Sequence, residues 1–141
     1  MELNDELYSE ILRLSSEGDA LCDDGEYQCA KEKFLLALGL VPTPKSDWEA
    51  ATWLFTALGE VSFLSQSYEE AVDYLFDAIN CPDGLANPFI MLRLGEALFE
   101  TGADVSRVND YLMRAFLLGG LDIFEGENDK YFELIKNLIP M

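Results

Sequence analysis

Small and large apolar residues recur at helical spacing along this chain, and the same pattern occurs three times. Each copy has a glycine four residues after a large apolar residue. A small, large, small series with spacings of four and three follows 12 or 13 residues later. Residues with these spacings share one face of a helix, so each copy predicts two antiparallel helices. The positions are Leu14, Gly18, Ala30, Phe34 and Ala37; Phe55, Gly59, Ala71, Leu75 and Ala78; and Met91, Gly95, Val108, Leu112 and Ala115.

The three copies are 41 and 36 residues apart, counted from glycine to glycine. A pair of helices cannot bury its apolar face alone, so repeated pairs stack on one another. Half of the 141 residues are apolar, which is enough for one domain with a continuous core. We therefore expect a single all-α domain, an α-α solenoid of three helical hairpins and a capping helix. The hairpins are expected over about 8–43, 47–83 and 87–120, and the capping helix over about 128–138.

The copies resemble the tetratricopeptide repeat, in which a glycine and small residues mark close helix crossings. The first copy also has Tyr27 at the predicted turn. Three positions depart from the family pattern: Glu17 replaces an apolar residue, Ser62 replaces an aromatic one, and Val108 stands at a small-residue position. The resemblance covers about residues 8–120. It implies tetratricopeptide-like hairpins and, for function, only that the protein binds something.

Capping residues predict where several helices begin. The predicted caps are a Ser46–Glu49 capping box, a Ser67–Glu70 capping box, and the side chains of Asn87 and Asn128. Pro88 is expected at a first helical position, where its missing N–H costs nothing. The acidic segment 120–127 carries apolar residues and is expected to pack against the domain.

The chain is strongly acidic, with 27 Asp and Glu, nine Lys and Arg, and a net charge of −18. Such a field repels nucleic acid and anionic membranes and favours a basic protein partner. The alternative is that the acidity serves only solubility. No apolar run approaches the ~18 residues of a membrane-spanning helix, and the first residues are acidic, unlike a signal peptide. With three cysteines in no metal-binding spacing, we expect reduced thiols and a cytoplasmic protein.

Residue types that carry catalysis are scarce. The chain has no histidine, which removes the commonest general base and metal ligand. It has no glycine-rich phosphate loop, and its Asp23-Asp24-Gly25 cluster lacks the alternating oxygen ligands of a calcium loop. We therefore expect no enzyme activity, no metal and no cofactor.

A second stripe of residues runs along the first helix of each hairpin, with spacings of three, four and three residues. Its positions are Leu12, Ser15, Asp19 and Cys22; Trp53, Thr56, Glu60 and Phe63; and Phe89, Leu92, Glu96 and Phe99. In tetratricopeptide folds this face lines the concave groove. An acidic residue directly follows each repeat glycine, and large aromatics occupy the second and third copies. Aromatic anchors surrounded by one sign of charge are typical of a binding surface for a cationic partner. The predicted partner-binding residues are Asp19, Asp23, Trp53, Thr56, Glu60, Phe63, Phe89, Arg93, Glu96, Phe99 and Glu100.

Two points of this site stay open in the sequence. Phe63 and Phe99 fit equally well as groove residues or as packing between neighbouring helices, whereas Trp53 and Phe89 favour the groove. Arg93, the one base of the stripe, is expected to pair with Glu60 or Glu96. A stripe with one base among several acids favours cations over a carboxylate tail.

Residues 44–53 and 87–90 resemble a family of small bacterial tetratricopeptide proteins, some of which are immunity proteins encoded beside polymorphic, Rhs-like toxins. The resemblance implies an immunity protein that neutralises a basic toxin domain through its acidic, aromatic groove. The alternative is a cytosolic adaptor or secretion chaperone that binds a basic peptide segment.

Overall fold

The computed structural model describes residues 3–140, and within them all regular structure is helical. The α-helices are α1 (Asp5–Asp23), α2 (Tyr27–Leu40), α3 (Glu49–Leu64), α4 (Tyr68–Ile79), α5 (Pro88–Glu100), α6 (Val105–Gly119) and α7 (Asp129–Ile135). Short 3-10 turns are η1 (Lys45–Asp47), η2 (Leu121–Phe124) and η3 (Lys136–Leu138).

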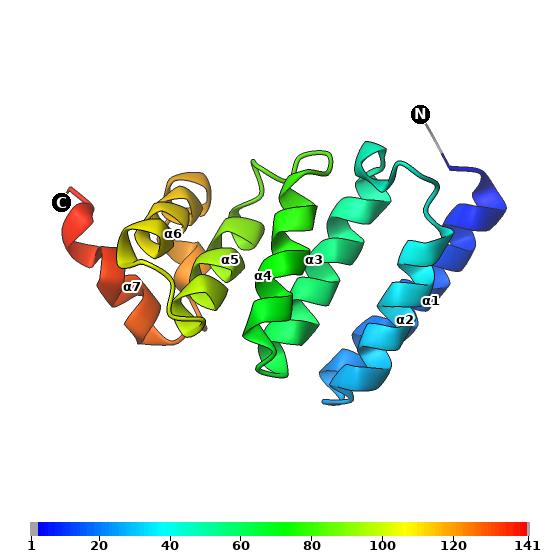
Figure 1. The fold of residues 1–141 in the computed structure, drawn as a ribbon, viewed down its shortest axis with the longest axis horizontal. Coiled ribbons are helices and arrows are strands. Elements are labelled where there is room, and N and C mark those ends of the chain that lie inside the picture. The colour runs from blue at the N-terminus through cyan, green and yellow to red at the C-terminus, as the bar shows by residue number, and fades with distance from the viewer. Residues whose placement is uncertain (1–2, 141) are drawn as a thin grey trace.

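Consecutive helices pack as adjacent hairpins: α1 with α2, α3 with α4, and α5 with α6. Helix α2 also packs on α3, and α4 packs on α5, so the hairpins stack in chain order. Figure 1 shows the helices side by side along the long axis, with α7 at the end opposite to α1. The predicted all-α solenoid is confirmed. None of the helices in residues 3–140 combines the length and the apolar character needed to cross a lipid bilayer.

Each hairpin closes where the repeat glycine of its first helix meets a large side chain of its second. The distances from an added Cβ to the nearest side-chain atom are 2.7 Å for Gly18 and Phe34, 2.6 Å for Gly59 and Leu75, and 2.8 Å for Gly95 and Leu112. A real Cβ does not come so close to another atom, so these crossings require glycine. The small residues of the second helices are equally confined: Ala37, Ala78 and Ala115 are fully buried. The predicted close crossings are therefore confirmed.

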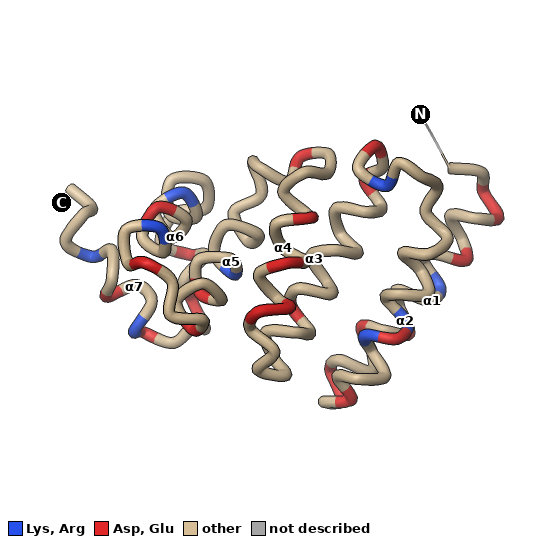
Figure 2. Tube along the Cα trace, in the orientation of Figure 1, with Lys and Arg blue, Asp and Glu red and all other residues tan. Residues whose placement is uncertain are grey.

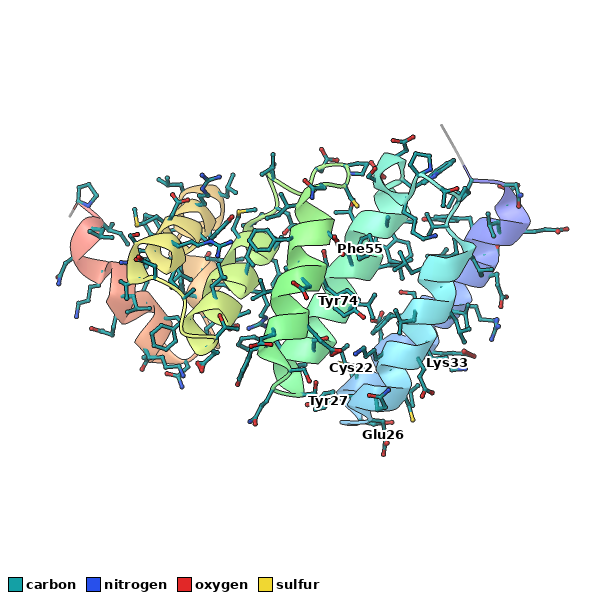
Figure 3. All side chains as sticks on the ribbon, in the orientation of Figure 1. Cys22, Glu26, Tyr27, Lys33, Phe55 and Tyr74 are labelled. Carbon is teal, nitrogen blue, oxygen red and sulfur yellow. The ribbon has the colours of Figure 1, made fainter. Side chains whose placement is uncertain are left out.

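The first two hairpins are joined on the side of α2 and α4. Lys31 Nζ donates to both carboxylate oxygens of Glu70, at 2.9 and 2.7 Å, and lies 5.8 Å from the centroid of the Tyr74 ring. Figure 3 shows Tyr74 in this region with Tyr27 and Phe55, which are partly buried against the N-terminal core. On the side of the first helices the packing is uneven, because α3 contacts α5 directly and has no contact of that extent with α1.

The larger spacing between the first two repeats comes from longer helices. Helix α3 begins ten residues before its repeat glycine, Gly59, whereas α5 begins seven residues before Gly95. The connections before these two helices, residues 41–48 and 80–87, have the same length. Helix α3 therefore has almost one additional turn at its start, and α5 has no counterpart to it.

Both predicted capping boxes are wrong. Ser46 lies within η1, and Trp48 is the N-cap of α3 without a capping bond from its side chain. Ser67 is the N-cap of α4 but also makes no side-chain cap, and Glu70 pairs with Lys31 instead. Ser46 lies in the η1 turn, too far before α3 to reach the free N–H groups of that helix. At the start of α4, the carboxylate of Glu70 forms an ion pair with Lys31 and therefore does not bond to the N-cap residue.

The asparagine caps are confirmed. The side chain of Asn87 accepts hydrogen bonds from the backbone N–H groups of Phe89 and Ile90, with Pro88 at the first helical position. Asn128 caps α7 in the same way. Helix α7 ends at Ile135, and only a 3-10 turn continues to residue 138, so the capping helix is shorter than predicted. In segment 120–127, Ile123 and Phe124 pack against the C-terminal core as expected, whereas Leu121 is exposed.

We predict that Gly59→Ala destabilises the protein by about 1–3 kcal/mol, because the new methyl group must displace the buried side chain of Leu75. Gly39→Ala in α2 is the matched control. A Cβ there meets no atom within 4 Å, so alanine should stabilise the protein by about 0.5–1 kcal/mol. Urea unfolding of the two variants measures both effects. Equal stability changes would contradict the requirement for glycine at the crossing.

Candidate functional site

Arg93 of α5 lies at the centre of a buried charge network that joins three parts of the chain. Its Nε and Nη2 donate to the two carboxylate oxygens of Glu60 on α3, at 2.7 and 3.1 Å. Its Nη1 donates to Glu96 on the same helix at 2.5 Å, and to Glu127, which precedes α7, at 2.7 Å. The Arg93 side chain is 8% exposed and that of Glu96 is 0% exposed. The expected pairing of Arg93 is confirmed with both candidates, and Glu127 adds a third.

One guanidinium cannot neutralise three carboxylates, and the network adjusts by protonation. Burial, together with the hydrogen bond that a protonated Glu96 makes with Glu127, raises the pKa of Glu96 to about 9 in spite of Arg93. Burial disfavours the charge of Arg93, but the carboxylates of Glu60, Glu96 and Glu127 outweigh it and raise the pKa of Arg93. At neutral pH Glu96 therefore holds a proton and Arg93 stays charged.

The C-terminal aromatics of the stripe pack against this network or against α7. The guanidinium carbon of Arg93 lies 4.6 Å from the centroid of the Phe63 ring and 5.1 Å from that of Phe89. Phe99 meets Tyr131 of α7 edge-on, with ring centroids 5.9 Å apart. Phe63, Phe89 and Phe99 thus all pack within the protein, and each stays half-buried with part of its surface exposed.

Glu100 belongs to the contact between α5 and α7. It accepts a hydrogen bond from Tyr131 Oη at 2.9 Å and forms an ion pair with Lys130 Nζ at 2.6 Å. Burial opposes ionisation of Glu100, but these two bonds lower its pKa below the ordinary value. Its carboxylate therefore holds the capping helix in place.

The structure corrects the predicted partner-binding site in its C-terminal half. Glu96 exposes no surface and Arg93 almost none, so neither can contact a partner. Glu60 and Glu100 are partly exposed, but their carboxylates already bond to Arg93 and to Lys130. The physical reason is that α5 packs on α3 and, through Phe99 and Glu100, against α7, so its carboxylates need counterions from within the protein.

The N-terminal half of the stripe is open by comparison. Asp19 and Asp23 of α1 are exposed, and Trp53 and Thr56 of α3 are half-buried. The hydroxyl of Thr56 donates to the carbonyl of Thr52 at 2.7 Å, within its own helix. Among the predicted residues, Asp19, Asp23 and Trp53 thus combine accessible surface with side-chain polar groups that bond to no other residue of 3–140.

The acidic residues of α1 and α3 converge around Cys22. Burial and then the carboxylates of Glu60, Asp23 and Asp19 raise the pKa of the Cys22 thiol. Burial, followed by Asp23, also raises the pKa of Asp19. A thiol in such surroundings is not activated as a nucleophile. Across residues 3–140, no group of three or more His, Cys, Asp or Glu side chains is placed to hold a metal ion.

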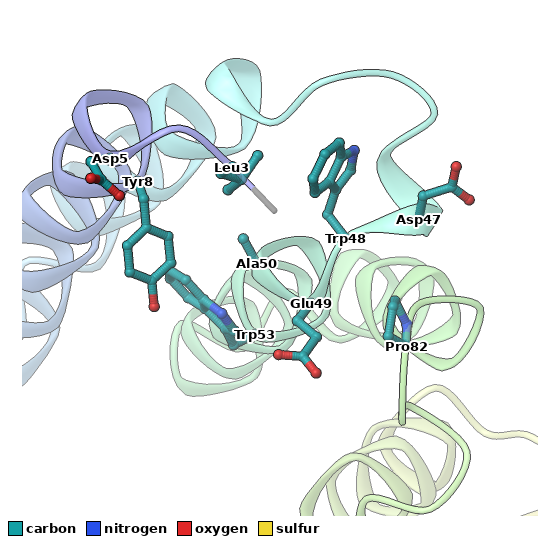
Figure 4. Close-up of a pocket in the computed structure, with 9 residues that line it drawn as sticks. All are labelled: Leu3, Asp5, Tyr8, Asp47, Trp48, Glu49, Ala50, Trp53 and Pro82. Carbon is teal, nitrogen blue, oxygen red and sulfur yellow. The ribbon is translucent and has the colours of Figure 1, made fainter. Parts of the chain in front are cut away.

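A pocket of about 530 Å³ lies between the start of α1 and the start of α3; we refer to it as the α1–α3 pocket. Figure 4 shows aromatic and acidic side chains from both helices and from η1 around it. Those that bear on its chemistry are Tyr8, Trp48, Trp53, Asp5, Asp47 and Glu49. Tyr8 is 45% exposed, and both tryptophans are half-buried. The lining contains no Lys or Arg.

Of these lining residues, the sequence had indicated only Trp53. Tyr8 and Glu49 extend the stripe by one turn toward the helix starts, four residues before Leu12 and Trp53, so the same spacing could have found them. Trp48 carried no such signal, because it precedes α3 and reaches the pocket through the path of the connection.

The charge of the chain is unevenly distributed. Residues 46–92 contain eight acidic residues and no Lys or Arg. Figure 2 shows this as a middle section, α3 and α4, with acidic positions only, while basic positions lie on the hairpins to either side. The acidic face of α3 therefore has no basic neighbour within its own hairpin, and its Glu60 is neutralised by Arg93 from the next one.

In comparisons with known proteins, no family model and no curated protein matched this chain.

We predict that the stability of the protein falls as pH rises from about 5 to 9, with Glu96 as the main cause. The folded-state pKa of Glu96, about 9, is above its ordinary value of 4.5. The folded state therefore binds one more proton between these values, and the stabilisation is full below pH 4.5 and is lost toward pH 9. Glu96→Gln keeps the shape without the titration and should flatten the pH dependence of urea unfolding. An unchanged slope in that variant would contradict the assignment.

Proposed function

We propose that this chain is a non-catalytic protein-binding module of the cytoplasm whose partner is a basic protein domain. Within that class, we propose an immunity protein that binds and neutralises a bacterial toxin domain. The charge of the surface suggests the class of partner. The biological role is suggested by the resemblance of residues 44–53 and 87–90 to small tetratricopeptide immunity proteins.

The observation that carries the proposal is an acidic surface without compensating bases. Seven of the nine Lys and Arg residues form ion pairs within the fold. Of the other two, Lys45 donates to the carbonyl of Val41, and Arg107 lies 5.3 Å from the centroid of the Phe76 ring. Most of the acidic residues in 3–140 thus have no basic partner in the protein. Such a surface attracts a basic domain and speeds the encounter.

The chemistry of the site supports binding rather than catalysis. Burial, with nearby carboxylates, raises the pKa of both Cys22 and Cys81, which keeps these thiols protonated. Glu96, the one strongly perturbed carboxyl group among residues 3–140, is fully buried and bonded to Arg93, so no substrate reaches it.

We predict that association with the basic partner is electrostatically steered. The test uses a toxin domain encoded beside this chain, in stopped-flow mixing at two salt concentrations. The Debye length shrinks from about 30 Å at 0.01 M to about 8 Å at 0.15 M, so the association rate should fall about tenfold or more. Co-expression should also restore growth of cells that express the toxin domain. A partner of acidic pI, or a rate independent of salt, would overturn the proposal.

A second prediction separates direct contact from the general field. Asp19→Lys with Asp23→Lys should raise the dissociation rate by about tenfold, because these exposed carboxylates lie on the open half of the stripe. Glu32→Lys with Asp73→Lys, on the exposed faces of α2 and α4, makes the same change in net charge. That control pair should slow association and leave dissociation unchanged. Equal effects of the two pairs on dissociation would place the interface elsewhere.

A peptide competition experiment distinguishes the adaptor or secretion chaperone from the immunity protein. If the protein is an adaptor that holds an extended segment, a short peptide from the partner should displace the partner. If it is an immunity protein that recognises a folded domain, the same peptide should not displace the partner.

A further inference from the structure

We propose that the α1–α3 pocket is a binding site for an arginine side chain of the partner protein. This inference rests on the proposed function, because it assigns to that basic partner the group that anchors it. The pocket is defined by its shape and lining, and it lies at the open end of the stripe. Its volume of about 530 Å³ falls within the range of ligand sites and admits the end of a long side chain.

The lining provides two kinds of attraction for a cation. Tyr8, Trp48 and Trp53 offer aromatic faces, and a guanidinium stacks on such faces through its own planar surface. Asp5 and Glu49 add carboxylates that form no ion pair with any of the residues 3–140. Carboxylates bind the guanidinium fork through two parallel hydrogen bonds, which an ammonium group cannot match. The combination therefore favours arginine over lysine.

No Lys or Arg side chain of residues 3–140 supplies that cation. Lys45, the basic residue nearest in sequence to η1, directs its Nζ to the carbonyl of Val41 at 2.8 Å. The next base along the chain is Arg93, which is enclosed in its own network. Exposed carboxylates and aromatic faces thus line the pocket, and these carboxylates form no ion pair with a Lys or Arg among residues 3–140.

The protein itself contains a precedent for this chemistry one repeat further on. Phe89 occupies the stripe position on α5 that Trp53 occupies on α3. Four residues after Phe89, Arg93 lies against its ring and bonds to carboxylates. Four residues after Trp53 the chain has Ala57, which provides no cation. At the α3–α5 contact, the arginine between an aromatic ring and carboxylates thus belongs to the protein itself. At the α1–α3 contact, we assign the corresponding arginine to the partner.

One interaction opposes a cation and is offset locally. The first N–H groups of α3 point toward its N-terminal end, and the partial positive charge there repels a guanidinium. Trp48 provides no side-chain cap for these groups. Glu49 in the first turn and Asp47 just before it place two negative charges at this helix end, which reverses the sign of the local field.

The two tryptophans of the chain both line the pocket, so their indole N–H signals in a ¹⁵N–¹H spectrum report on it directly. The probe is the peptide acetyl-Gly-Arg-Gly-amide, and the control is the same peptide with citrulline, a neutral group of the same shape. We expect the arginine peptide to shift both indole signals saturably, with a dissociation constant roughly tenfold or more below that of the citrulline peptide. Equal shifts by the two peptides, or no saturation, would overturn the inference.

Variants assign the effect to the carboxylates without disturbing the core. Glu49→Gln, at an exposed position of the first turn of α3, should raise the dissociation constant of the arginine peptide by about three- to tenfold. Glu32→Gln removes the same charge from an exposed position of α2 outside the pocket and should leave binding unchanged. Equal weakening by both variants would show a non-specific effect of charge and would count against the pocket.

Failure of this inference can be told apart from failure of the proposed function. If the basic partner domain binds tightly and Glu49→Gln and Trp53→Leu leave its dissociation rate unchanged, the arginine site is wrong and the protein-binding function stands. If the partner is acidic or association ignores salt, the proposed function itself is wrong. Circular dichroism of Trp53→Leu checks that the helices are retained.

Discussion

Close contact between the two helices of each hairpin determines how the rest of this protein is arranged. Gly59 has no Cβ, so the side chain of Leu75 fills the space against the backbone of α3. The same contact recurs in the other two hairpins. It uses the apolar face of every first helix for packing within the hairpin. The remaining face of α1, α3 and α5 carries the stripe of acidic and aromatic residues. The residues of the next hairpin decide whether these side chains are buried and paired or stay exposed.

Between α3 and α5 the stripe is closed. Carboxylates brought into this contact lose water, and the loss is tolerable only with a counterion and hydrogen bonds. Arg93 provides both to Glu60, while Glu96 keeps a proton because a third negative charge would exceed what one guanidinium can stabilise. Glu127 extends the network to the segment before α7. A cluster that resembles a binding surface in sequence is here part of the framework.

Between α1 and α3 the same kinds of residue remain accessible. Glu49, in the additional turn of α3, and Trp53, one turn further on, line the same pocket as Tyr8 of α1. Helix α1 has no contact with α3 as extensive as that between α3 and α5. The stripe is thus divided into a half that is bonded within the protein and a half that stays accessible. The C-terminal half carries the ion pairs that hold α3, α5 and α7 together, and the N-terminal half keeps charge and aromatic surface available. Changes in the open half should therefore affect binding with little effect on folding.

The sequence by itself determined the helices, their pairing and the close crossings, because these depend on local periodicity and on glycine at fixed spacing. The asparagine caps were equally local, since a cap needs only a side chain next to the first helical residue. The predicted capping boxes at Ser46 and Ser67 were wrong. A 3-10 turn contains Ser46, and an ion pair with Lys31 engages the glutamate that would complete the box of Ser67. Periodicity also placed Asp19, Glu60 and Glu96 on one helical face. Only the tertiary structure decided which of them is exposed, because burial and the choice of counterion depend on the neighbouring hairpin. Trp48 entered the pocket for the same reason: the path of a connection, which no periodic pattern describes, placed it there.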